Sequence, residues 1–213
     1  GIRDVERSRG LGDVYKRQIL VIAYPVQYSE TMDISAMAYA MEPTVMIYDT
    51  LVSIDYDYNY HPGGLTERWE VSDDGTVVTF YLKKGVTFHD GSPFNAEVVK
   101  WWLELMASDA SSVAYMYNAI TDIEVVDDYT VVLHTEEPFP ALFYYLSGAW
   151  GLVMSKETYE SLGPDEYASH PSGTGPFILE EWVPNDHLTL VKNPDYNWAA
   201  EWTGHTGPAN VDK

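Results

Sequence analysis

Apolar and polar residues alternate in the middle of the chain, with the period of β-strands that bury one face. Val78, Phe80 and Leu82, for example, are separated by more polar residues. The stretches EVSDDGTVVTF (70–80) and EVVDDYTVVLH (124–134) both place an acidic pair between β-branched runs. Each stretch is typical of a β-hairpin with an Asp-rich turn. The same alternation predicts a third hairpin within 172–196, with residues 184–186 as its loop.

Helical spacing appears in two segments. Asn95 is a good N-cap, Glu97 suits the first turn, and an apolar stripe follows at Val98, Val99, Trp102, Leu103 and Met106. A second helix is expected to start at Pro43, with apolar positions at 45, 47, 48, 51 and 52. Before it, the run 19–26 has the composition of a buried strand, and Leu152–Met154 is a short apolar strand. Strands that alternate with helices indicate an α/β fold.

Charge divides the chain into two unlike parts. Residues 1–18 hold five basic and three acidic residues, have no periodicity, and are interpreted as a non-native leader. The remaining chain is strongly acidic within a total net charge of −21, and it offers no basic patch for a phosphate backbone. Nucleic-acid binding is therefore excluded. The chain has no Cys, which removes disulfides, thiolate metal sites and Cys nucleophiles.

The stretch from His89 to Glu97 has the residue types of a catalytic or metal-binding loop. A joint of strand, turn, N-cap and helix explains the same residues, and we favour that structural interpretation. Residues 55–66 imitate a calcium loop but have Tyr60 where Gly is needed and Thr66 where a bidentate Glu is needed. The six His residues lack metal-ligand spacing. No metal, cofactor or catalytic residue is predicted.

Met and aromatic residues give the better candidates for a binding site. Tyr39 and Met41 lie in a Met-rich loop after the predicted first strand, and in α/β sheets ligands bind at the carboxyl ends of strands. Trp150 lies between two glycines, where its ring can stack on a ligand. We predict Tyr39, Met41 and Trp150 as ligand-binding residues, with Tyr117 behind them. Core packing is the alternative role for all of them.

In their order along the chain, four stretches resemble the extracellular solute-binding proteins of peptide/nickel-type ABC transporters. They are LTERWEVSDDGTVVTFYLKKGVTFHDGSPFNAEVVK (65–100), VVDDYTVVLHTEEPFPALFYYL (125–146), SGTGPFILEEWVPNDHLTLVKNPDY (172–196) and GPANVDK (207–213). The resemblance implies a periplasmic-binding-protein-like fold with two lobes, of which this chain supplies part of the first. It assigns 19–60 to the start of the first-lobe core, 61–171 to an inserted α+β subdomain, and 172–213 to the returning core before the second lobe.

The resemblance also implies a function. Such a protein is a receptor, not an enzyme: it captures short peptides or a related small solute and delivers it to membrane permease subunits. It is expected to be a monomer in the periplasm or lipid-anchored at the cell surface of a prokaryote, and its signal sequence is not present in this chain. A nickel-chelate receptor of the same family is the alternative, with Met41 near the ligand, although the stretch 147–154 lacks the Arg of that branch. A hydrolase with an acidic cleft and a cell-surface adhesion module are alternatives of other classes.

Overall fold

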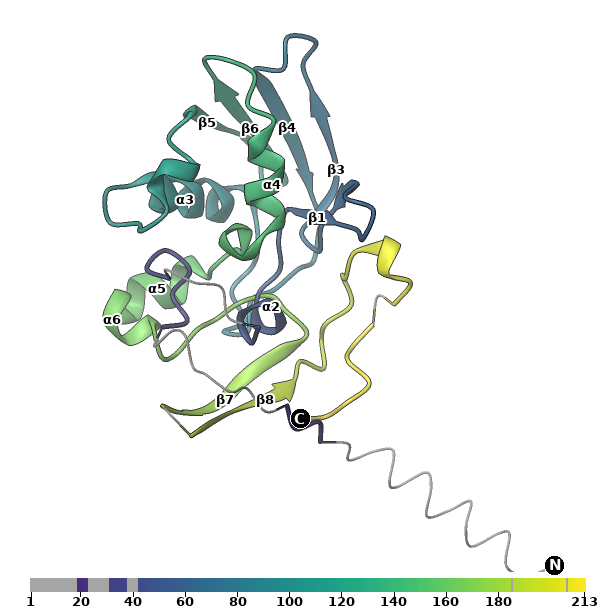
Figure 1. The fold of residues 1–213 in the computed structure, drawn as a ribbon, viewed down its shortest axis with the longest axis vertical. Helices are drawn as coiled ribbons and strands as arrows, with labels where there is room; N and C mark the ends of the chain where they lie inside the picture. The colour runs from purple at the N-terminus through teal and green to yellow at the C-terminus, as the bar shows by residue number, and fades with distance from the viewer. Residues whose placement is uncertain (1–18, 23–30, 38–41, 185, 206) are drawn as a thin grey trace, which may run out of the picture.

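The computed structural model describes residues 19–22, 31–37, 42–184, 186–205 and 207–213. A four-stranded sheet with helices α3 and α4 beside it occupies one end of the molecule (Figure 1). The β7–β8 hairpin, α2, α5 and α6 occupy the other end. Strands and helices are mixed, as the alternation of the two periodicities predicts.

The large sheet consists of β3 (Thr66–Val71), β4 (Val77–Leu82), β6 (Thr130–Thr135) and β5 (Ile120–Asp127), in the order β3-β4-β6-β5. All neighbouring pairs are antiparallel. Both hairpins predicted from the two similar stretches are therefore confirmed. In the first turn the carboxylate of Asp74 accepts hydrogen bonds from Ser72 Oγ, Thr76 N and Thr76 Oγ1, which explains the acidic turn.

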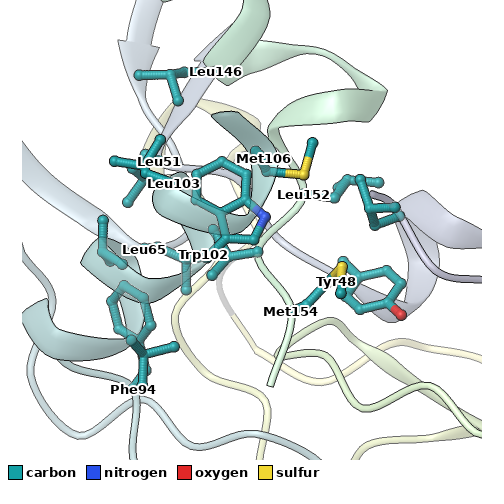
Figure 2. Packing of buried hydrophobic residues seen from close by; sticks show 14 of the residues in the cluster. Tyr48, Leu51, Leu65, Phe94, Trp102, Leu103, Met106, Leu146, Leu152 and Met154 are labelled. Atoms are coloured by element: carbon teal, nitrogen blue, oxygen red, sulfur yellow. The ribbon is translucent and has the colours of Figure 1, made fainter. Parts of the chain in front are cut away.

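Helix α3 (Ala96–Ala107) covers one face of this sheet through contacts with β5 and β6. The Asn95 side chain accepts a hydrogen bond of 3.1 Å from Val98 N, which confirms the N-cap. The predicted stripe is buried, with Trp102, Leu103 and Met106 fully inaccessible. Figure 2 shows Trp102 packed among Leu103, Met106 and Leu152 in this core.

The helix predicted after Pro43 is shorter than its apolar pattern indicates. Helix α2 spans only Thr44–Ile47, and the backbone becomes extended at Tyr48. Thr50 then pairs with Leu152, and β1 (Val52–Ile54) pairs with β2 (Tyr60–Pro62). Leu51 and Val52 are buried where the chain pairs as an extended segment, so their apolar side chains pack in the core without forming the face of a helix. Tertiary pairing overrides local periodicity here.

Two predicted strands are also wrong in the described residues, although residues 23–26 of the predicted strand 19–26 lie outside them. Ile19–Ile22 form no strand, and all four side chains are exposed, with Leu20 N bonded to Lys213 O. Leu152–Met154 are buried as expected but make a single bridge to Thr50. An apolar run reports burial more directly than it reports ladder pairing.

The third predicted hairpin is confirmed as β7 (Phe177–Val183) and β8 (His187–Lys192), an antiparallel pair. Along the chain, α4 (Ala141–Ser147), α5 (Lys156–Leu162) and α6 (Pro164–Tyr167) come between β6 and β7. The described residues also contain three 3₁₀ turns, η1 (Ala114–Met116), η2 (Ala149–Gly151) and η3 (Glu201–Thr203). Among the described residues, none of the helices has the length and apolar character needed to cross a bilayer.

Candidate functional site

The loop 31–37 precedes the predicted ligand residues, and Asp33 fixes its local conformation. The carboxylate of Asp33 accepts hydrogen bonds from Ser35 N at 2.8 Å and Ser35 Oγ at 2.7 Å. This is an Asx-type turn, which a short polar side chain favours. Burial raises the pKa of Asp33 above its usual value, although the Ser35 hydrogen bonds oppose that change.

The segment 111–117 follows α3 and includes η1. Its serines donate hydrogen bonds to main-chain carbonyl oxygens of the 31–37 loop. The Ser35 carbonyl oxygen accepts hydrogen bonds from Ser112 N at 2.8 Å, Ser112 Oγ at 3.1 Å and Ser111 Oγ at 3.3 Å. The Met37 carbonyl oxygen lies 3.3 Å from Ser112 Oγ. The position of the loop is thus set by a segment 75 to 77 residues further along the chain.

Trp150 in η2 contacts the same loop from the other side. Its indole Nε1 donates to the Met37 carbonyl oxygen at 3.4 Å, and its side chain is partly buried. The glycine at 151 is required by close packing, because a Cβ there would lie 2.5 Å from the Leu146 carbonyl oxygen. The Trp150 ring therefore contacts the loop and is only partly exposed.

Tyr117 lies behind Trp150. Its side chain is fully buried, and its hydroxyl group donates to the Trp150 carbonyl oxygen at 2.7 Å. Burial raises the pKa of Tyr117 well above its usual value of 10, so the hydroxyl group stays protonated and remains a donor. In this geometry Tyr117 positions the Trp150 loop and does not face solvent.

Of the four predicted ligand-binding residues, the structure brings Trp150 and Tyr117 together and places the end of the 31–37 loop beside Trp150. Tyr39 and Met41 lie outside the described residues. Sequence reasoning missed Ser112, because a serine pair in a polar connection carries no recognisable signal of long-range contacts.

The His89–Asp90 turn has structural partners on both sides. His89 Nε2 lies 3.0 Å from the Gly175 carbonyl oxygen. The Asp90 carboxylate accepts hydrogen bonds from Ser92, Ser155 and Thr158, which joins the turn to the start of α5. Burial alone would raise the pKa of Asp90, but these hydrogen bonds outweigh it and lower the pKa to about 2. These contacts support the interpretation of the His89–Glu97 stretch as a structural connection between strand and helix, and not as a catalytic loop.

A second buried carboxylate, Asp49, holds the segment that follows β8. It accepts hydrogen bonds from Tyr196 Oη at 3.0 Å, Thr174 Oγ1 at 3.1 Å and Trp198 Nε1 at 3.1 Å. Burial raises the pKa of Asp49 to about 6, against the effect of these donors. Nearby, Lys83 Nζ donates to the Trp198 carbonyl oxygen at 2.8 Å. The carboxylate of Asp49 thus holds the segment after β8 through its side chains, and the ammonium group of Lys83 holds the same segment through its main chain.

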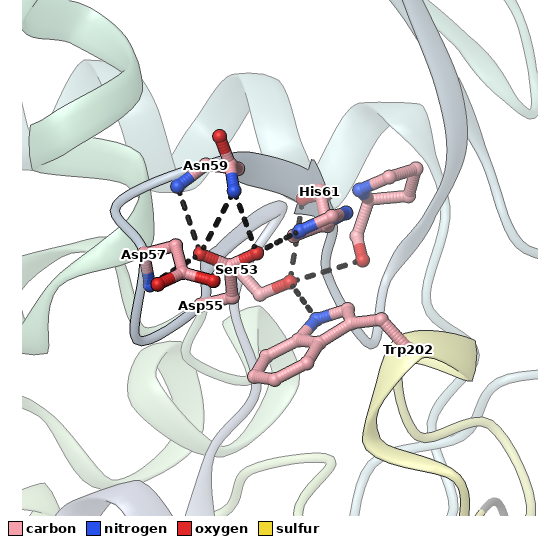
Figure 3. A network of polar contacts seen from close by, with 7 residues as sticks. Ser53, Asp55, Asp57, Asn59, His61 and Trp202 are labelled. Carbon is pink, nitrogen blue, oxygen red and sulfur yellow. Dashed lines mark hydrogen bonds and ion pairs between the residues drawn. The ribbon is translucent and has the colours of Figure 1, made fainter.

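The stretch that imitates a calcium loop is a closed polar network (Figure 3). The Asp55 carboxylate accepts hydrogen bonds from Asp57 N and Asn59 N, both at 2.9 Å, and lies 2.8 Å from His61 Nε2. The His61 ring stacks on Trp202 with centroids 5.5 Å apart. The Asp55 carboxylate, which would be the first calcium ligand, is therefore already paired with protein donors. Across the described residues, no group of three or more His, Asp or Glu side chains is arranged to hold a metal ion.

A hollow of about 830 Å³ lies between α5 and the β7–β8 hairpin. Thr158, Leu162 and Trp182 are among the residues that line it. Neither Trp150 nor Tyr117 lines this hollow, so it is separate from the site built around the Met37 carbonyl.

Comparison with known proteins gives relatives for most of this chain. The glutathione-binding protein GsiB of Salmonella choleraesuis (strain SC-B67) is 36% identical over 152 residues, which cover 70% of this chain and 29% of that protein. The chain thus spans less than a third of the length of this curated relative.

Solved structures share the fold. The periplasmic binding protein DppA from Helicobacter pylori, in complex with the peptide STSA, superposes with a TM-score of 0.72 at 30% identity. That match covers 85% of this chain and 39% of DppA. NikZ from Campylobacter jejuni, in complex with Ni(L-His), has a TM-score of 0.70 at 23% identity, over 78% of this chain and 34% of NikZ. The likeness to NikZ shows the fold alone.

Residues 60–213, well over half of the chain, match the family model described as "Bacterial extracellular solute-binding proteins, family 5 Middle". This chain belongs to the family 5 bacterial extracellular solute-binding proteins.

Proposed function

We propose that this chain is part of the substrate-binding receptor of an ABC importer that captures short peptides and delivers them to a membrane permease. The family match carries the proposal, together with 36% identity to a glutathione-binding protein. Glutathione is therefore the first ligand to test. The peptide bound by DppA, which is 30% identical to this chain, supports the same ligand class.

The ligand contacts this chain at the meeting point of the 31–37 loop and the Trp150 loop. Trp150 provides an aromatic wall and an indole N–H, and Tyr117 fixes the main chain of Trp150 from behind. Tyr39 and Met41 follow the clamped loop within four residues of Met37. In this arrangement main-chain groups and aromatic or Met contacts hold the ligand.

The same proposal covers the organisation of the chain. Residues 19–60 and 172–213 belong to the core of the first lobe, and 61–171 form a subdomain inserted in it. The receptor works as a monomer in the periplasm or anchored at the cell surface, and it closes by a hinge motion on its ligand. It binds and releases without covalent chemistry, as expected of a relative of binding proteins.

Calorimetric titration of the full product of the native gene tests this function. We expect saturable 1:1 binding of reduced glutathione or of the peptide Ser-Thr-Ser-Ala, and weaker binding in Trp150→Ala. A Ni²⁺-histidine titration run beside it tests the nickel-chelate alternative. Saturation by the nickel complex alone would contradict peptide capture, and hydrolysis of a peptide would contradict a receptor without turnover.

A further inference from the structure

The hydrogen bonds around Ser112 leave one donor with two acceptors. The Ser112 hydroxyl has a single proton, yet its oxygen lies 3.1 Å from the Ser35 carbonyl oxygen and 3.3 Å from the Met37 carbonyl oxygen. The proton can serve either carbonyl. Ser112 itself is exposed, so its side chain has room to rotate.

The Ser35 carbonyl does not depend on that proton. It also accepts hydrogen bonds from Ser112 N at 2.8 Å and from Ser111 Oγ at 3.3 Å. If the Ser112 hydroxyl turns away, two donors remain for an oxygen with two lone pairs. Rotation of the hydroxyl toward Met37 therefore leaves no unpaired carbonyl behind.

The Met37 carbonyl, by contrast, depends on the Ser112 hydroxyl if its bond to Trp150 is lost. Among the described residues, its other donor is Trp150 Nε1 at 3.4 Å, which is longer than the usual 2.7–3.2 Å of an N–H to oxygen bond. If the Trp150 indole moves, Met37 loses that donor. Within the part of the chain that the structure describes, the Ser112 hydroxyl is positioned to replace it.

We infer that Ser112 is a positioning residue that releases the Trp150 indole N–H for the ligand. On ligand capture, Trp150 Nε1 donates to an oxygen of the ligand, and the Ser112 hydroxyl takes over the Met37 carbonyl. The ligand class is one with a carbonyl or carboxylate acceptor, which a short peptide provides. This inference rests on the proposed function, because it concerns the same site.

The test compares Ser112→Ala with Ser112→Thr, which keeps the hydroxyl, in the full product of the native gene. Calorimetric affinity for glutathione, or for Ser-Thr-Ser-Ala, is expected to weaken about three- to tenfold in Ser112→Ala, the value of one hydrogen bond. It is expected to stay within twofold (~0.4 kcal/mol) in Ser112→Thr. Ser161→Ala is the matched control, since Ser161 is also exposed and donates only within its own helix, to the main-chain carbonyl of Thr158.

A second readout separates positioning from stability. The indole N–H resonance of Trp150, identified by its loss in Trp150→Phe, is expected to shift on ligand saturation, while the melting temperature without ligand is the same in all Ser112 variants. Equal affinity of Ser112→Ala and the unsubstituted protein, or an unmoved Trp150 resonance, would overturn the inference alone. If the unsubstituted protein binds neither peptide, the proposed function fails and the inference with it.

Discussion

The hydroxyl group of Tyr117 donates a hydrogen bond to the main-chain carbonyl oxygen of Trp150, at 2.7 Å and across 33 residues of sequence. Tyr117 is fully buried and Trp150 is not. The buried Tyr117 therefore fixes the main-chain position of the partly exposed Trp150. Any influence of Tyr117 on ligand binding is expected to act through the Trp150 loop.

Replacement of Tyr117 by Phe removes this hydrogen bond and keeps the ring. The free energy of unfolding is expected to fall by about 1–2 kcal/mol, because the carbonyl of Trp150 loses its donor. Ligand affinity is expected to fall because the loop is less well fixed. Thermal unfolding and calorimetric titration measure the two effects.

Tyr115→Phe is the control for that substitution, since Tyr115 lies in η1, the turn whose C-cap position is Tyr117, but is 65% exposed. We expect both quantities to stay unchanged in Tyr115→Phe. Equal affinity of Tyr117→Phe and the unsubstituted protein would show that the Trp150 loop is held by other contacts.

The glycine at 173 is expected to tolerate no side chain. A Cβ at this position would lie 2.1 Å from the Ile47 carbonyl oxygen, which is main chain and has no free rotamer to relieve the clash. Gly173→Ala is therefore expected to cost about 3 kcal/mol or more. Gly207→Ala, whose Cβ would have its nearest neighbour at 3.9 Å, is expected to change stability by less than about 0.5 kcal/mol. Urea unfolding of both variants checks the difference, and similar midpoints would rule out tight packing of the 172–176 turn on α2.

The buried carboxylate of Asp49 predicts an unusual dependence of stability on pH. Because burial raises its pKa from 3.8 to about 6, the folded protein binds this proton more tightly than the unfolded chain does. Stability from Asp49 is therefore fully present below pH ~4 and is lost as the pH rises through ~6. The sign is the reverse of that for an Asp in a salt bridge.

Asp49→Asn removes this titration and keeps the shape of the side chain. Between pH 7 and pH 4 the unsubstituted protein is expected to gain up to about 3 kcal/mol relative to the Asn variant. Urea unfolding at several pH values measures the change. A constant difference between the two proteins over this range would mean that Asp49 does not titrate on folding in the expected window.

The Asp90 carboxylate predicts the ordinary sign and separates a receptor from an enzyme. Its pKa of about 2 means that its contribution to stability is present above pH ~4 and is lost as the pH falls toward ~2. Because the group is half-exposed, we expect Asp90→Asn to cost only about 1 kcal/mol at pH 7. Ligand affinity is expected to be retained in Asp90→Asn and in Glu97→Gln. Selective loss of a turnover activity in folded variants would favour the hydrolase alternative.

The elements that sequence predicts correctly are those whose information is local. Asn95 caps α3 with its own side chain, and Asp74 closes the first hairpin turn within five residues. The alternation of Val78, Phe80 and Leu82 translates directly into a buried face. In these places one short stretch contains both the signal and the partner.

The errors and omissions have a different physical origin. Thr50 pairs with Leu152, about a hundred residues away, instead of continuing the predicted helix. No local sequence pattern indicates that pairing. The clamp from Ser112 to the Met37 carbonyl is likewise a contact between a side chain and a distant main-chain group. Candidate aromatic residues could be selected by type, but which of them face a ligand depends on such long-range contacts.

Native mass spectrometry, with metal analysis, of the full gene product purified gently from its producing cells tests the central claim most directly. We expect masses of short peptides, glutathione among the candidates, to be released when the protein is denatured. After its ligand has been removed, the protein is expected to bind the same peptides again and to show the same added masses. A protein that carries no peptide and binds none would contradict a peptide receptor, and a single adduct that contains nickel would establish the metal-chelate alternative instead.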